Sequence, residues 1–348
     1  MKQLRLLLLP FSWLYGAVLF IRHFLYDKGF LKSTSFNKPV IVIGNLIIGG
    51  AGKSPMTEYL IRRLSDHYHL ATLSRGYGRK TKGFIKVDTG STAEEVGDEP
   101  LQFKKKFPDI TVADCEDRVK GLKNLLPHHD LCLLDDAFQH RALRAGLAIL
   151  LFDFSSLKKW KFLIPAGNYR DLFSRRYHAD ILVVTKSPEV MSDRDREEAM
   201  RALRLKKPIP VFFSFIHYSK YIYTLSGERL TIPIGATFLV IVGIANPTSF
   251  IDYLRSVGKV SKVLTYRDHY RYVESDVDKI KKNWLMLGAD TIIITTEKDA
   301  MRLNDPSLGL VLEGLPIYYL PIEIAFHHEV KKMHFDAVLT EKLRKLSK

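Results

Sequence analysis

The 348-residue sequence predicts an α/β fold with two domains. Apolar runs typical of buried strands alternate with segments whose apolar residues recur at helical spacing, which is the pattern of a parallel sheet covered by helices. This alternation occurs in residues 33–210, giving a three-layer domain, and again in residues 236–348, giving a second and smaller one. Residues 211–235 alternate apolar and polar side chains with short turns, so we expect a two-stranded linker there.

The first domain is predicted to form around residues 39–55, where an apolar strand passes through a glycine-rich turn into an amphipathic helix. Glycines in this turn permit positive φ, so that successive N–H groups can converge on an oligophosphate at a helix N-terminus. Lys53 would reach the terminal phosphates, and the Ser54 hydroxyl would ligate Mg²⁺. The strict P-loop pattern has a glycine where Ile47 stands. A solvated lysine in a plain glycine-rich turn is the alternative. We expect the nucleotide to be bound by Gly49, Gly50, Ala51, Gly52, Lys53 and Ser54.

Paired acids end the apolar strand predicted over residues 131–134, where Asp135 and Asp136 follow. Downstream of a phosphate loop this arrangement is typical of a Walker B element, in which one carboxylate binds Mg²⁺ directly or through water and the other orients a ligand. The sequence leaves open which of the two touches the metal. Gln139 and His140 come next and are expected to line the same cleft.

A basic turn, Arg75-Gly-Tyr77-Gly-Arg79, follows a strand predicted over residues 69–74. Ligands of open α/β sheets usually bind at such strand ends. Two arginines and a tyrosine between glycines suit a phosphate or a sugar, and an ordinary basic turn explains the pattern equally well.

Two further acids, Asp98 and Glu99, precede Pro100 in what looks like the first turn of a helix that runs through Phe107. Carboxylates are common at this position because they cap the helix, and the local pattern alone favours that interpretation.

The rest of the first domain is expected to hold strands over residues 147–152 and 181–185, with a loop over residues 165–171 between them. A charged helix over residues 193–205 closes this domain.

In the linker we expect residues 211–218 and 221–230 to pair as two strands that bridge the domains. The second domain is predicted to have strands beginning near Phe238, Val260 and Thr291.

Two polar segments of the second domain, residues 268–270 and 296–300, each follow a predicted strand and are therefore expected to face a ligand. An isolated Asp-His pair such as Asp268-His269 is more often a surface feature. From His327 the sequence predicts an amphipathic basic helix that packs back on the body.

The N-terminal residues 1–32 contain sixteen uncharged residues, Leu6 to Ile21, which fall short of the ~20 that a membrane-spanning helix needs. Trp13 and Tyr15 lie inside this run. Together with basic flanks they favour a helix lying in the interface of an anionic membrane, and a buried core helix is the main alternative. The absence of an A-x-A-like cleavage site argues against a signal peptide. The basic flanks are Lys2, Arg5, Arg22, Lys28 and Lys32.

The formal charge of +15 requires an acidic partner, and nucleic acid, an anionic membrane or a phosphorylated substrate would all qualify. We expect no nucleic acid, because no basic stretch is interleaved with aromatic residues on the scale that single-strand binders need. Cys115 and Cys132 are too few and too loosely spaced for a disulfide framework or a zinc site, which indicates a reducing, cytosolic compartment.

These motifs together resemble the tetraacyldisaccharide 4′-kinase family over almost the whole chain. The family's phosphate loop also lacks the first glycine. This sequence departs from the family by having Ser54 where threonine is more usual and Asp171 where we expect glutamate, which leaves a metal-orienting role of Asp171 open. The matching segments are residues 9–15, 43–46, 49–55, 74–79, 97–100, 135–141, 165–167, 243–247, 268–269 and 296–300.

The resemblance implies a peripheral enzyme at the cytoplasmic face of the bacterial inner membrane, with ATP and Mg²⁺ between its two domains. It would transfer the γ-phosphate of ATP to the 4′-hydroxyl of a tetraacyldisaccharide 1-phosphate, giving lipid IVA in lipid A biosynthesis. It assigns Asp98 as the base for the sugar hydroxyl, with His269 as its partner, and the Asp135-Asp136 pair to magnesium. Contacts to the lipid are expected from Arg75, Tyr77, Arg79, Gln139, His140 and Arg170.

A membrane-docked P-loop NTPase switch without an acceptor substrate is the alternative function. Residues 185–188 lack the aspartate of a guanine-reading N-K-x-D motif, which counts against a GTPase switch.

Overall fold

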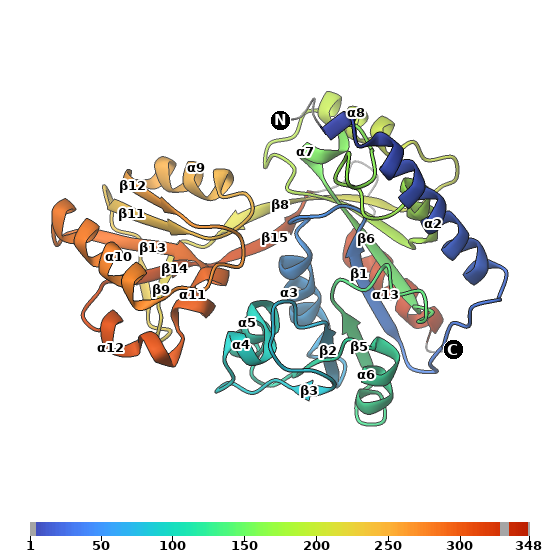
Figure 1. Cartoon of the computed structure of the whole chain (residues 1–348), viewed down its shortest axis with the longest axis horizontal. Coiled ribbons are helices and arrows are strands. Elements are labelled where there is room, and N and C mark those ends of the chain that lie inside the picture. Colours follow the sequence, from blue (N-terminus) through green and yellow to red (C-terminus); the bar gives the residue numbers. More distant parts are fainter. Residues whose placement is uncertain (1–4, 328–333, 347–348) are drawn as a thin grey trace.

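The computed structural model describes residues 5–327 and 334–346 and places its strands in two mixed sheets (Figure 1). The first sheet has nine strands in the order β15-β8-β7-β6-β1-β5-β2-β4-β3, parallel except for the edge strands β15 and β3. These are β1 (Val40–Asn45), β2 (Leu70–Ser74), β3 (Ile85–Lys86), β4 (Thr111–Asp114), β5 (Leu131–Leu134), β6 (Leu147–Asp153), β7 (Ile181–Thr185), β8 (Val211–Tyr218) and β15 (Ile322–Phe326).

The alternation of side chains along β1 divides the core of the first sheet between its two faces. Ile41 and Ile43 point into one cluster with the apolar side of the helix after the glycine-rich turn, whereas Val40 and Val42 point into another. All six residues of β1 are buried, as expected for a central parallel strand with helices on both sides. The helical elements of this part are α3 (Lys53–Leu64), α4 (Ala93–Val96), α5 (Asp98–Lys106), α6 (Arg118–Leu125), α7 (Phe154–Leu157), η1 (Phe173–His178), α8 (Asp193–Leu203) and α13 (Phe335–Leu346).

The second sheet has six strands in the order β10-β9-β14-β13-β11-β12. Leu239 and Ile241 of the strand Thr237–Val242 pack on one face, and Phe238 and Val240 on the other. The strands are β9 (Tyr221–Thr224), β10 (Arg229–Thr231), β11 (Thr237–Val242), β12 (Lys259–Thr265), β13 (Thr291–Thr296) and β14 (Ile317–Leu320). Its helices are α9 (Thr248–Val257), α10 (Glu274–Leu287), α11 (Glu297–Leu303), η2 (Pro306–Leu308) and α12 (Gly309–Leu312).

Two strands connect the sheets, but they are not the expected pair. The prediction that residues 211–218 pair with residues 221–230 is wrong, because β8 pairs antiparallel with β15 whereas β9 pairs with β10 and β14. The chain passes from β8 into the second sheet at Ser219 and returns at Pro321, where Ser219 N donates to Pro321 O at 3.1 Å. Both connecting strands run between the sheets in Figure 1.

Helix α13 also lies elsewhere than expected. Phe335, Leu339 and Leu343 pack into the core cluster of the first sheet, beside α3 and β1. The prediction that a C-terminal helix belongs to the second α/β unit is therefore wrong, although its apolar stripe does pack back on the body. Of the predicted helix from His327, residues 328–333 lie outside the described residues.

Helix α2 (Leu9–Asp27) covers most of the predicted N-terminal segment and lies along the outside of the first sheet (Figure 1). Its buried residues are Ser12, Leu19 and His23, so the alternative of a buried core helix does not hold. Within the described part of the chain, no helix has the length and apolarity that crossing a membrane requires. Lys2, one of the basic flanks, lies outside the described residues.

Candidate active site

The glycine-rich turn between β1 and α3 has the backbone geometry of an anion-binding loop. Gly49 and Gly52 adopt positive φ, of 111° and 79°, whereas Gly50 does not. No side chain caps the N-terminus of α3, so the N–H groups of its first turn remain available to a ligand. The end of β7 holds the turn in place, since Thr185 Oγ1 donates to Ala51 O at 2.8 Å and Lys186 Nζ donates to Gly50 O.

Lys53, at the start of α3, points toward the acids that follow β5. Its Nζ lies 3.9 Å from Asp136 Oδ1, and Arg170 Nη1 donates to Asp136 Oδ2 at 2.9 Å. Burial alone would raise the pKa of Asp136, but the hydrogen bond from Arg170 and the charge of Lys53 lower it below its ordinary value. Asp136 is therefore a carboxylate fixed between two cations.

Asp135, its neighbour, lies in the opposite electrostatic situation. It is buried, and it accepts a hydrogen bond from Thr57 Oγ1 at 3.3 Å. Burial, followed by the negative charge of Glu99, raises the pKa of Asp135 to about 7. A buried carboxylate in this state gains from a nearby cation, which favours its charged form.

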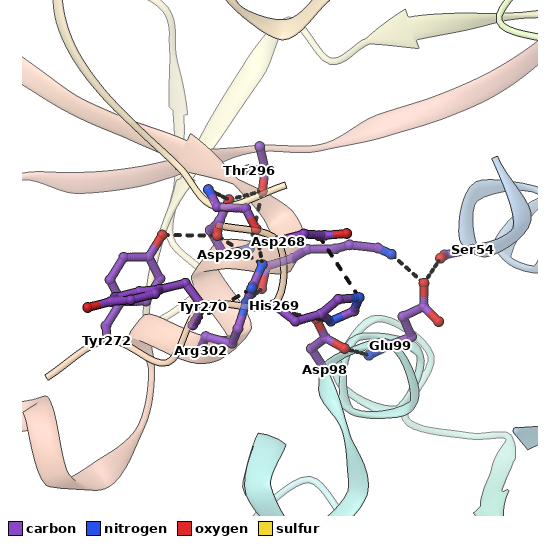
Figure 2. Close-up of polar contacts among 12 residues, drawn as sticks. Ser54, Asp98, Glu99, Asp268, His269, Tyr270, Tyr272, Thr296, Asp299 and Arg302 are labelled. Atoms are coloured by element: carbon purple, nitrogen blue, oxygen red, sulfur yellow. Dashed lines mark hydrogen bonds and ion pairs between the residues drawn. The ribbon is translucent and has the colours of Figure 1, made fainter. Parts of the chain in front are cut away.

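A second acidic pair, Asp98 and Glu99, begins α5 and faces the second sheet (Figure 2). His269 Nδ1 lies 3.0 Å from Asp98 Oδ2, and Arg302 Nε lies 3.8 Å from the same oxygen. Burial alone would raise the pKa of Asp98, but the hydrogen bond to His269 and the charges of Lys298 and Arg302 lower it to about 2. The hydrogen bond to Asp98 raises the pKa of His269 in turn.

Glu99 joins the phosphate loop to the second sheet. Ser54 Oγ donates to Glu99 Oε1 at 2.6 Å, and Lys298 Nζ forms an ion pair with the same oxygen. Burial would raise the pKa of Glu99 and lower that of Lys298, but their mutual attraction outweighs it and keeps both groups charged. The sequence analysis interpreted Glu99 as a helix cap. It expected residues 296–300 to face a ligand but did not single out Lys298.

Asp299 holds in place the residues beside the second sheet that contribute to this site. It is fully buried and accepts hydrogen bonds from Gly243 N at 3.0 Å, Tyr272 OH at 3.0 Å and Arg302 Nη2 at 2.9 Å. Thr296 Oγ1 donates to it at 2.7 Å and also caps α11, the helix that carries Lys298. This network, shown in Figure 2, sets the direction in which Arg302 and Lys298 approach the first sheet.

Comparison with known proteins identifies the family. The family described as LpxK, tetraacyldisaccharide-1-P 4′-kinase, matches residues 4–344. The chain belongs to this kinase family. The tetraacyldisaccharide 4′-kinase of Flavobacterium johnsoniae is 41% identical over 99% of this chain and 98% of its own length, and that of Flavobacterium psychrophilum is 43% identical over 95% of each.

A solved structure of the same family matches the whole fold. The crystal structure of the apo form of LpxK from Aquifex aeolicus in complex with ATP superposes with a TM-score of 0.76 and 30% identity. It covers 98% of this chain and 99% of that one. The expected P-loop α/β fold and the resemblance stated above are thereby confirmed.

The residues expected to touch the lipid in this 4′-kinase family member differ in exposure and in the direction of their side chains. Arg75 and Tyr77 are exposed, and the Tyr77 ring lies 5.0 Å from the His269 ring. Arg79 instead turns away, since its Nη2 donates to Glu116 Oε1 at 2.6 Å and its side chain is buried. The geometry of Arg79 fits an internal ion pair better than a substrate contact.

The segment after β5 brings its predicted residues to the phosphate loop. Gln139 Nε2 donates to Asn45 O at 2.8 Å, next to the bond from Arg170 Nη2 to Asn45 Oδ1 at 2.7 Å. Burial lowers the pKa of His140, whose Nε2 has no hydrogen-bond partner among the described residues. Its ring is therefore kept neutral.

Asp171, the residue that departs from the family pattern, binds α2. Its Oδ1 lies 2.7 Å from His23 Nε2 and accepts from Leu172 N at 2.8 Å. The carboxylate thus fastens the N-terminal helix to the loop that carries Arg170.

Proposed function

We propose that this chain transfers the γ-phosphate of ATP to the 4′-hydroxyl of a tetraacyldisaccharide 1-phosphate, with the Asp98–His269 pair on the acceptor side. Family membership supports the reaction. The observation that carries the residue roles is that Asp98, 3.0 Å from His269, adjoins Glu99, which binds Ser54 of the phosphate loop at 2.6 Å. Glu99 thus connects Asp98, its neighbour in the chain, to Ser54 of the phosphate loop.

Asp98 orients the sugar hydroxyl and receives its proton. With its pKa lowered to about 2, it is a carboxylate at neutral pH and can accept a hydrogen bond from the hydroxyl. Phosphoryl transfer proceeds through a loose transition state, so positioning matters more than early proton removal. As the bond between the sugar oxygen and the γ-phosphorus forms, the bond from that phosphorus to the bridging oxygen breaks and ADP leaves. The attacking hydroxyl becomes acidic and its proton passes to Asp98, while His269 keeps the carboxylate in place.

Lys53 and the first turn of α3 hold the oligophosphate of ATP. The uncapped N–H groups of α3 and the Lys53 ammonium present positive charge where the transferred phosphoryl group carries negative charge. We assign Gly49 to Ser54 to this contact. The relative from Aquifex aeolicus, crystallised in complex with ATP, supports the assignment.

The residues around Asp135 fit a magnesium ion. They supply oxygen donors, and the raised pKa of Asp135 marks a buried carboxylate that a divalent cation would bring back to its charged form. In the described part of the chain, no three His, Cys, Asp or Glu side chains form a ready-made metal cluster. Mg²⁺ bound to nucleotides commonly takes only one or two carboxylates, with phosphates and water as its other ligands. We assign Ser54, Asp135 and Asp136 to this ion, which would neutralise phosphate charge when bound.

The lipid acceptor requires access to a membrane, and we propose that α2 provides it as a peripheral anchor at the cytoplasmic face of the inner membrane. The helix exposes large apolar side chains along its outer face, among them Trp13 at 73%, Leu14 at 67% and Phe20 at 63%. Burial of this face in the interface would place the loop of Arg170, which α2 contacts, near the lipid headgroups.

We further propose that catalysis occurs between two units of the chain. The first comprises residues 33–218 together with residues 322–327 and 334–346, and the second comprises residues 219–321. Their division follows the strand order of the two sheets and replaces the boundaries expected from the sequence.

A coupled assay tests this function against a switch that hydrolyses ATP without an acceptor. Purified protein is incubated with ATP and Mg²⁺, with and without tetraacyldisaccharide 1-phosphate, and both ADP and bisphosphorylated lipid are measured. We expect ADP release in step with lipid product and little of it without lipid. ADP release that is unaffected by lipid, with no phospholipid product, would establish the switch instead.

A further inference from the structure

A short loop after α7 exposes a tryptophan that the proposed reaction does not use. The Lys158–Phe162 loop reads Lys-Lys-Trp-Lys-Phe, and Trp160 is 83% exposed. Its ring stacks parallel to that of Phe162, with centroids 5.8 Å apart and an interplanar angle of 3°. The paired rings of Trp160 and Phe162 leave an aromatic surface available for a contact outside the chain.

The loop is fastened directly to α2. Leu163, the next residue, accepts a hydrogen bond at its carbonyl oxygen from Ser12 Oγ at 2.9 Å. A Cβ on Gly16 would lie 3.0 Å from Leu163 Cδ1, so the glycine permits this close approach. The carbonyl oxygen of Pro165, two residues after Leu163, accepts hydrogen bonds from Arg5 Nε at 3.2 Å and from Arg5 Nη2 at 3.1 Å. The residues that follow the loop are therefore held against α2 and the turn before it.

The exposed face of α2 and this loop lie on the same part of the molecule. Figure 1 shows α7, from which the loop leaves, close to the N-terminal end of α2 and far from the second sheet. Both surfaces present an exposed indole, Trp13 on α2 and Trp160 on the loop. Tryptophan is favoured where apolar surface meets a layer of polar headgroups, because its ring is apolar and its N–H is polar.

The charges around Trp160 match an anionic surface. Lys158 Nζ forms an ion pair with Glu198 Oε2 at 2.6 Å, so part of the lysine's charge is already compensated. Lys159 is exposed, and Lys161 donates to Leu157 O at 3.0 Å, which keeps its ammonium beside the loop. Lys161 is half-buried, with its Nζ 4.9 Å from the centre of the Phe173 ring, so Lys159 supplies the exposed positive charge next to the indole. A basic residue beside an exposed indole is typical of segments that bind anionic lipid headgroups.

We propose that the Lys158–Phe162 loop is a second membrane contact, in which Trp160 enters the interface of an anionic bilayer beside α2. The proposal rests on the membrane docking of α2 proposed above and extends it. Two contacts on a rigidly connected frame fix the angle at which the protein sits on the bilayer, which a single helix does not.

Tryptophan fluorescence separates the two contacts, because the chain has only three tryptophans: Trp13, Trp160 and Trp284. Trp284 belongs to the second unit, where its Nε1 donates to Thr291 O at 2.8 Å, and it serves as a constant background. Trp13→Phe leaves Trp160 as the membrane reporter, Trp160→Phe leaves Trp13, and the double variant leaves only the background. Each protein is mixed with vesicles of phosphatidylglycerol and phosphatidylethanolamine that carry brominated acyl chains.

We expect a blue shift and bromine quenching in both single variants and neither in the double variant. Quenching of the Trp13 reporter without quenching of the Trp160 reporter would overturn the second contact and leave the docking of α2 intact. Absence of quenching in both would overturn the docking of α2 and the loop together. Quenching of the Trp160 reporter alone would support the loop and contradict the role of α2.

Removing the indole tests the contribution to binding. Trp160→Ala should weaken binding to the same vesicles about tenfold and raise the KM for vesicle-borne lipid, with the KM for ATP unchanged. The matched control is Ile234→Ala, which removes a fully exposed apolar side chain from the second unit and should leave vesicle binding unchanged. Unchanged vesicle affinity of Trp160→Ala, or an equal loss in the control, would overturn the proposal.

Discussion

Asp98-Glu99 and Asp135-Asp136 are two pairs of adjacent acids in one site, yet their surroundings differ. The first pair receives its cations from the second unit, through Lys298 and Arg302, and Asp98 is also hydrogen-bonded to His269. The second pair receives Lys53 and Arg170 from the first sheet, and both lie against Asp136. Among the described residues, the Thr57 hydroxyl is the hydrogen-bond donor to the Asp135 side chain. The pKa of Asp135 rises to about 7, whereas that of Asp98 falls to about 2.

This difference shows that adjacency in sequence does not give carboxylates a common state. The charge of the Asp98-Glu99 pair depends on the position of the second unit, because its cations belong to that unit. Asp136 receives its cations, Lys53 and Arg170, within the first unit, whereas no ion pair joins Asp135 to a cation in the part of the chain that the structure describes. Movement of the two units relative to each other would therefore change the acceptor side of the site more than the nucleotide side.

The largest effect is expected from Lys53→Ala, which removes a cation from Asp136 and from the phosphates. We expect kcat to fall about 10²–10³-fold with little change in the melting temperature, since the side chain contributes no core packing. Steady-state kinetics and thermal unfolding measure the two. Lys123→Ala, at an exposed position on α6, is the matched control and should keep full activity. Near wild-type kcat in Lys53→Ala would contradict the role of the phosphate loop.

The second effect concerns the pair that spans the two units. Asp98→Ala and His269→Ala should each lower kcat about 10²-fold, and the double variant should lose much less than the product, because coupled groups act as a unit. Single-turnover and steady-state rates of all four proteins give the coupling. Multiplicative losses, or a His269 variant with an altered KM only, would show that the two residues act separately.

A smaller effect is expected in the pH dependence of stability. The folded-state pKa of Asp98, about 2, lies below its ordinary value of 3.8, so its charge stabilises the fold above pH 4 and this contribution is lost as pH falls toward 2. At about 1.4 kcal/mol per pKa unit the full contribution is about 2 kcal/mol. Urea unfolding should show the stability difference between wild type and Asp98→Asn narrowing by about 1 kcal/mol from pH 5 to pH 3.

The matched control for that measurement is Asp135→Asn, studied without Mg²⁺ or nucleotide. The raised pKa of Asp135 means that the folded state holds a proton that the unfolded chain releases, so wild-type stability falls as pH rises from about 4 to about 7. Asp135→Asn should remove that fall and become relatively more stable at pH 8 than at pH 5. If both variants responded to pH in the same direction, the proposed contrast between the two pairs would be wrong.

The smallest effect is expected from Lys298→Met, which removes one of the cations that the second unit contributes but leaves both acids and Arg302. Its charge lowers the pKa values of Asp98 and Glu99, so its removal should raise both and move the acidic limb of the pH–rate profile to higher pH. We expect kcat at pH 8 to fall no more than about tenfold. An unshifted acidic limb would show that Lys298 acts on neither acid.

The sequence predicted those parts that depend on local pattern. The succession of β1, glycine turn and α3 follows from residues close together in the chain, and so do the strand ends at Asp135 and Thr296. The partnership of Asp98 with His269 came only from the family resemblance, because nothing local connects two residues so far apart.

What the sequence did not predict depends on long-range packing. The alternation in residues 211–230 indicates strands but cannot say that β8 pairs with β15, since many strands present a similar edge. The apolar stripe of α13 likewise fits either sheet. Arg79 looked available for a substrate because its partner Glu116 comes from a distant turn, and Lys298 was overlooked because a lysine after a helix cap is usually solvated.

The return of the chain through β15 affects how the protein is made. Synthesis on the ribosome proceeds from the N-terminus, so β8 emerges long before β15, with the whole second unit between them. Until then β8 presents an open edge, and the face that α13 covers remains uncovered. The nucleotide-binding half is therefore the last part of this chain to be completed, and the unit inserted within it can fold first.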